Sequence, residues 1–154
     1  MTKKIMGHIS TVYGCIIGER WRSEDYHRLQ RLNKQIIDTL PDNEDVFPWL
    51  TRNMFMVPDP DKDKMYCDQV IVVGASYKSV EHEWEEWLQK FEGLLKRLYW
   101  SSATIHLETE LVGNYRYEWV FDINQANHWT DDNPQPTSLW TFKGGPRKFF
   151  DDYK

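Results

Sequence analysis

The residues 102–122 contain the pattern that most restricts the fold, because two stretches alternate between apolar and polar side chains. In SATIHLETEL, Ile105 and Leu107 share one face, while His106 and Glu108 share the other. In NYRYEWVFD, one face carries only rings, from Tyr115, Tyr117, Trp119 and Phe121. A period of two predicts half-buried β-strands. Strands of this kind need a second layer that covers their apolar face.

The connection between the two stretches sets which residues face one another in the hairpin. A two-residue turn at Gly113-Asn114 would place polar side chains opposite rings. A three-residue loop, Val112-Gly113-Asn114, keeps both apolar sets on one face, and we favour it. That register pairs Glu110 with Arg116, Glu108 with Glu118, and His106 with Val120.

Two segments show helical spacing and supply that second layer. The first runs from a Ser23 N-cap to Pro41, and the second begins after a Ser79 N-cap and ends near Leu98. Further strands are predicted over residues 8–17, 52–57 and 68–76, with a short one at 138–142. The run VIVV within 68–76 is uniformly apolar, which predicts a central strand covered on both faces.

The predicted order is β-α-β-β-α-β-β, which indicates an α+β fold. We expect two helices packed on one face of a mostly antiparallel sheet, with a ferredoxin-like arrangement as the first expectation. The 154 residues fit a single domain, with a core over 1–122 and a proline-containing tail over 123–154. The tail is expected to pack back on the core through its rings, Trp129, Trp140, Phe142, Phe149 and Phe150.

Charge and cysteine content narrow the possible partners and the compartment. The net charge is −5 and the basic residues are dispersed, which argues against nucleic acid as a partner. Cys15 and Cys67 are the only cysteines, too few for a disulfide framework, so we expect reduced thiols. No apolar run reaches the ~20 residues of a membrane span, and the N-terminal residues lack the apolar core of a secretion signal. These features predict a cytoplasmic protein without a membrane partner.

Two short motifs resemble metal sites but lack the ligands. HEWEE offers only His82 and Glu86 on the wetter side of the second helix, too few for zinc. DPDKDK places aspartates at alternate positions, but Lys64 stands where a calcium loop needs glycine. We therefore expect neither a metal nor a cofactor.

The leading hypothesis is a protein-binding module without catalysis of its own. The chain has 8 Trp, 8 Tyr and 7 Phe, more rings than one core of this size needs. Acidic side chains steer a basic partner and rings anchor it, as in inhibitors and immunity-type proteins that neutralise basic toxins. The residues expected to bind the partner are Glu108, Glu110 and Glu118 on the hairpin and Glu81 and Glu85 on the second helix.

A second hypothesis is an enzyme. The tripeptides His8-Ile-Ser10 and His106-Leu-Glu108 resemble the paired motifs of the two-histidine phosphoesterases, although Glu108 stands where that family has a hydroxyl. The resemblance implies that His8 and His106 act as the acid–base pair and that Ser10 holds the phosphate. A third hypothesis is a small-molecule sensor in which the aromatic tail closes a pocket against the sheet.

Overall fold

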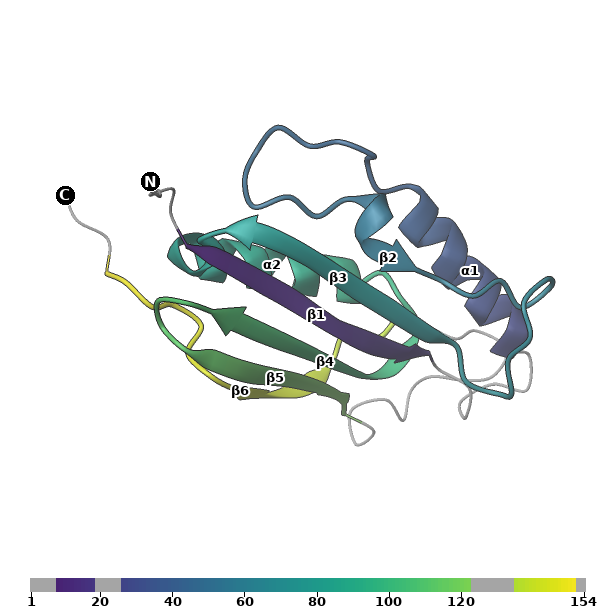
Figure 1. The fold of residues 1–154 in the computed structure, drawn as a ribbon. Helices are drawn as coiled ribbons and strands as arrows, with labels where there is room; N and C mark the ends of the chain where they lie inside the picture. The colour runs from purple at the N-terminus through teal and green to yellow at the C-terminus, as the bar shows by residue number, and fades with distance from the viewer. Residues whose placement is uncertain (1–7, 19–25, 123–134, 152–154) are drawn as a thin grey trace.

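A six-stranded antiparallel sheet and two α-helices make up the fold (Figure 1). The computed structural model describes residues 8–18, 26–122 and 135–151. The strand order across the sheet is β2-β3-β1-β4-β5-β6. The strands are β1 (Ile9–Gly18), β2 (Phe55–Met56), β3 (Val70–Lys78), β4 (Trp100–Thr109), β5 (Asn114–Phe121) and β6 (Trp140–Gly144). The helices are α1 (Tyr26–Asp38) and α2 (Trp84–Leu95), with 3-10 turns η1 (Arg52–Met54) and η2 (Val80–Glu83).

The chain path forms two interleaved units. All neighbouring strands are antiparallel, so β1 and β2 run in the same direction with β3 between them. By the same logic β3 and β4 run in one direction with β1 between them. Helix α1 connects the first pair and α2 the second, which makes two split β-α-β units. Strands β5 and β6 then extend the sheet beyond β4.

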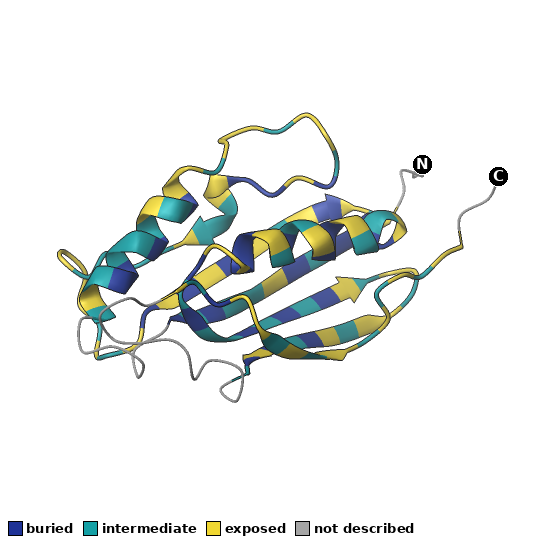
Figure 2. Cartoon of the chain, turned by 180° about the vertical axis from the view of Figure 1, so that it is seen from behind, coloured by how far each residue is buried: buried dark blue, intermediate teal, exposed yellow. Residues whose placement is uncertain are grey.

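The core lies between the sheet and the helices, which both cover the same face (Figures 1 and 2). Rings from α2 fill most of it: Trp84 stacks on Trp87 and Trp87 on Phe91, and Trp119 of β5 packs against Phe91. These four side chains are almost completely buried. A fully buried aromatic side chain removes 150–250 Å² from water, so this stack contributes a large share of the burial that stabilises the fold.

The other face of the sheet carries no layer of described residues, and this overturns one prediction. The apolar run in β3 was expected to be covered on both faces. Instead Ile71 and Val73 face the helices, while Val70 and Val72 are exposed on the open face beside Met56 of β2. The apolar run therefore reflects β-propensity on the open face as well as burial on the other.

The predicted start of the second helix is also wrong. Ser79 has left-handed backbone angles, and its hydroxyl donates to the backbone carbonyl of His8 instead of capping the helix. The hydroxyl of Ser10, from β1, accepts the free N–H of Val80 in its place. A 3-10 turn follows before α2 begins at Trp84. The predicted cap at Ser23 lies outside the described residues.

The described part of the tail packs on the core. Strand β6 pairs with β5, and Phe142 packs against Trp119. A Cβ on Gly144 or Gly145 would fall within 2.6 or 2.7 Å of β5 atoms, so only glycine fits this crossing. Beyond it, Arg147 makes a bidentate ion pair with Glu92 of α2 at 2.7 and 3.0 Å. Trp129 lies outside the described residues.

Candidate functional site

The five glutamates expected to bind a partner do not form one surface. Glu81 is only 1% exposed, and neither of its carboxylate oxygens has a hydrogen-bond partner among the described residues. Glu85 lies on α2, in the helix layer. Glu108 lies on β4 and Glu118 on β5, and Glu110 is the first residue after β4. The polar side chains of both strands line the open face of the sheet. Glu81 is therefore not available to a partner in this conformation, and the other four glutamates lie on two different layers of the fold.

The hairpin has a different register from the predicted one. Glu108 faces Asn114, His106 faces Arg116, and Glu118 faces Thr104. The expected contact between Glu108 and Glu118 is therefore wrong, although each residue keeps its predicted face. A four-residue loop over 110–113 causes the change. Its backbone is fixed by Thr109, whose hydroxyl donates to the carbonyl of Gly113 and accepts the N–H of Val112.

Each hairpin glutamate is neutralised or bonded by a neighbour. Glu118 forms ion pairs with Arg116 and, at 3.8 Å, with Lys143 of β6. Glu110 lies 3.5 Å from Nδ1 of His8 and accepts the N–H of Ile9. We call Glu108, Glu110 and Glu118 the sheet-face carboxylates.

Glu108 makes its contact with a ring of β1. It accepts the Tyr13 hydroxyl at 2.5 Å, and this hydrogen bond raises the pKa of that tyrosine. Glu108 and Glu110 also line a pocket of about 300 Å³ at this end of the sheet.

The structure does not assemble the two-histidine site. His106 faces Tyr13 of β1, and the two rings stack at 5.0 Å. His8 precedes Tyr13 by five residues, which in an extended strand is about 17 Å. Ser10 is fully buried, and its hydroxyl donates to the carbonyl of Tyr77 and accepts the N–H of Val80. The predicted grouping of His8, Ser10 and His106 around one phosphate is therefore wrong.

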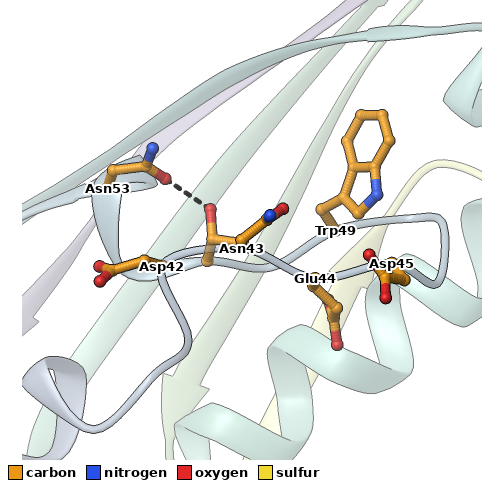
Figure 3. Close-up of a pocket in the computed structure, with 7 residues that line it drawn as sticks. Asp42, Asn43, Glu44, Asp45, Trp49 and Asn53 are labelled. Carbon is orange, nitrogen blue, oxygen red and sulfur yellow. Dashed lines mark hydrogen bonds between the residues drawn. The ribbon is translucent and has the colours of Figure 1, made fainter.

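A site that the sequence interpretation missed lies in the connection between α1 and β2. A cavity of about 480 Å³ opens there (Figure 3). Its lining combines carboxylates, amides, a hydroxyl and one indole, from Asp42, Asn43, Glu44, Asp45, Trp49, Thr51 and Asn53. We call residues 42–53 the acidic loop.

The acidic loop is tied to the rest of the protein at several points. Lys90 of α2 reaches it, donating to Glu44 at 3.2 Å and to the carbonyl of Pro48 at 2.8 Å. Glu44 also accepts the N–H of Leu50, whose side chain is buried. The N–H of Arg52 closes the base of the loop on the carbonyl of Pro41. These contacts restrain the loop, and a restrained loop loses less conformational entropy when it binds a partner.

Trp49 is held in place by two other rings. Tyr77 of β3 stacks beneath it at 6.1 Å, and Phe47 meets it edge-on at 5.0 Å. The Tyr77 hydroxyl donates to the carbonyl of Trp49, and burial raises the pKa of Tyr77 to about 12. Even so, Trp49 remains 39% exposed. A fixed, partly exposed indole is the type of side chain that anchors protein partners.

Some carboxylates of the acidic loop are paired with a cationic side chain and one is not. Asp42 pairs with Arg52, and Glu44 pairs with Lys90. Asp45 has no hydrogen bond or ion pair with any other residue that the structure describes. Beside it, Val46 is 67% exposed. The loop thus presents an unpaired negative charge, an exposed aliphatic side chain and an anchored ring within five residues.

The sequence contained a signal for this site, but it was a weak one. The segment DNEDVFPWL combines acidic residues with three large apolar side chains, which a purely solvated loop does not need. Sequence alone could not show that Tyr77 and Lys90, both distant in the chain, fix the loop from below.

Other kinds of site find no support in the described residues. No group of three or more His, Cys, Asp or Glu side chains there has a metal-binding arrangement. None of the described helices is long and apolar enough to cross a membrane. Between the described tail and the sheet, the rings of Trp140, Phe142 and Phe149 pack against the core. Comparison with known families, curated proteins and solved structures finds no significant match.

Proposed function

We propose that this chain is a protein-binding module that recognises a basic protein through the acidic loop. The observation that supports it is the cavity in which the fixed, exposed Trp49 lies beside the unpaired Asp45. Negative charge accelerates the encounter with a basic surface, and a rigid aromatic residue at the centre supplies affinity. The net charge of −5 adds to the same long-range attraction.

The specific role that we propose is that of an inhibitor or immunity-type protein. Such proteins cover a basic partner with carboxylates and rings and need no catalytic groups. We also propose that the chain works in the cytoplasm, which fits its two free thiols, Cys15 and Cys67. The two interleaved β-α-β units further support the proposal of a ferredoxin-like unit over β1 to β4, extended by β5 and β6.

Capture of partners from the native host tests the proposed function. The bait is the wild-type chain or the Asp42→Asn/Asp45→Asn variant, with Glu108→Gln/Glu118→Gln as the matched control of equal charge change. We expect a basic protein to be captured by wild type and by the control, and to be lost from the loop variant. A basic protein retained equally by all three baits would refute the acidic loop as the binding surface. Capture of acidic or neutral proteins alone would refute the basic partner.

A further inference from the structure

We propose that the cavity of the acidic loop takes one arginine side chain of the partner, with its guanidinium group stacked on Trp49. This inference rests on the proposed function and specifies how the partner is recognised. Tyr77 stacks on the Trp49 ring, and Phe47 meets the ring edge-on. Trp49 also lines the cavity and is 39% exposed, so part of its indole is open to a ligand.

Every polar side chain that lines the cavity carries at least one oxygen atom that can accept a hydrogen bond. Asp45 is unpaired, and Arg52 contacts only Oδ1 of Asp42. The side-chain oxygen of Asn53, which also lines the cavity, accepts a hydrogen bond from the hydroxyl of Thr51 (Figure 3). A carboxylate or amide oxygen can accept more than one hydrogen bond. The cavity lining therefore offers several acceptors to a ligand that carries several hydrogen-bond donors.

An arginine side chain matches these features better than a lysine side chain does. The guanidinium group is planar, stacks on aromatic faces and presents five N–H donors in a fixed arrangement. An ammonium group is a compact, strongly hydrated charge that can use the indole face but not several separated acceptors at once. The chain itself offers a precedent at the rim, where the guanidinium of Arg52 binds the carboxylate of Asp42.

The test is an NMR titration of the full chain with three small probes. Nα-acetyl-arginine amide is the ligand mimic, Nα-acetyl-lysine amide tests for charge alone, and Nα-acetyl-citrulline amide is the uncharged analogue of arginine. We expect the arginine probe to shift the amides of residues 42–53 and the indole N–H of Trp49, with a dissociation constant on the order of 1–10 mM. The lysine probe should bind at least about threefold more weakly, and citrulline should cause no saturable shift.

Variants complete the test. Trp49→Leu should remove the preference for arginine over lysine, and Asp42→Asn/Asp45→Asn should weaken both probes about equally. Glu108→Gln/Glu110→Gln, which alters the pocket at the end of the sheet, should leave the titration unchanged. Equal shifts with arginine and lysine, shifts confined to residues 108–114, or no saturable shift would each overturn the inference. If that happens while the loop variant still loses the captured basic protein, the proposed function stands and only the arginine mode is wrong.

Discussion

The acidic loop and the open face of the sheet both combine carboxylates with exposed apolar side chains, yet they differ in how those carboxylates are used. On the sheet, each hairpin glutamate is engaged by a neighbour: Tyr13 binds Glu108, His8 lies beside Glu110, and Arg116 and Lys143 flank Glu118. In the loop, Asp45 is unpaired beside a fixed indole. An unpaired charge next to a rigid ring, more than the number of acidic residues, therefore marks a surface prepared for a partner.

The largest expected difference between the two regions is the loss of affinity when an aromatic side chain is truncated. Trp49→Ala should reduce affinity for the captured basic protein by at least about 30-fold, because truncating a central tryptophan anchor typically costs 2 kcal/mol or more. Tyr13→Ala, on the open face, should change affinity by less than about threefold. Calorimetric titration of both variants at one salt concentration measures this. A larger loss with Tyr13→Ala would move the binding surface to the sheet.

Tyr77 under the acidic loop and Tyr13 on the open face should differ in how much they contribute to the pH dependence of stability above pH 10. Burial holds the pKa of Tyr77 at about 12, whereas a tyrosine in the unfolded chain has a pKa of about 10. Unfolding therefore releases a proton between these values, and the free energy of unfolding falls as pH rises from 10 to 12. The contribution of Tyr77 is about 2 kcal/mol at pH 12.

Denaturant titrations at pH 8 and pH 12 measure that pH dependence. Tyr77→Phe should reduce the loss of unfolding free energy between pH 8 and pH 12 by about 2 kcal/mol, whatever the substitution does to stability at pH 8. The exposed Tyr13 is the matched control, and Tyr13→Phe should leave most of the pH dependence in place. Equal pH dependence in wild type and Tyr77→Phe would show that this hydroxyl is not buried under Trp49.

The two lysines that pair with glutamates should differ in their effect on stability. Lys90→Met removes an ion pair with Glu44 and a hydrogen bond to Pro48, and should lower the free energy of unfolding by about 1–2 kcal/mol. Lys143→Met removes only a long contact from a largely exposed side chain, so stability should not change measurably. Urea titration compares the variants, and equal effects would mean that Lys90 does not hold the loop.

The smallest expected effect is on the association rate. Asp45→Asn should slow association with the captured basic protein about two- to fivefold at low salt, and the difference should shrink at high salt. Glu118→Gln should have little effect, because Arg116 and Lys143 already offset that charge. Stopped-flow measurements at two ionic strengths test both. If Glu118→Gln slows association more than Asp45→Asn does, the contrast between the regions fails.

The sequence patterns predicted the layers of this fold well because they depend on local periodicity. The alternation in 102–122 placed each side chain on its observed face, and helical spacing located α1 and α2. The register failed because it depends on how Thr109 organises the hairpin loop. The exposure of Val70 and Val72 could not be predicted either, since a run of valines looks the same whether one or two faces are covered.

The candidate site was harder to predict than the fold. The glutamates predicted to bind a partner lie largely on regular elements, where Glu108 is hydrogen-bonded by Tyr13 and Glu118 is paired with Arg116 and Lys143. The acidic loop could not be recognised from the sequence, because the contacts that fix it come from Tyr77 and Lys90, which lie far away in the sequence. Contacts between distant segments therefore decided which charges stay available, and no local pattern records those contacts.

The most direct test places a photo-crosslinking residue in each region and compares the products in the native host. Val46 in the acidic loop and Val120 on the open face are both exposed aliphatic residues, at 67% and 46%, and neither is needed for the core. If the acidic loop binds the partner, position 46 will crosslink to a basic protein and position 120 will not crosslink to that protein. A basic protein crosslinked from position 120 but not from position 46 would contradict binding through the acidic loop.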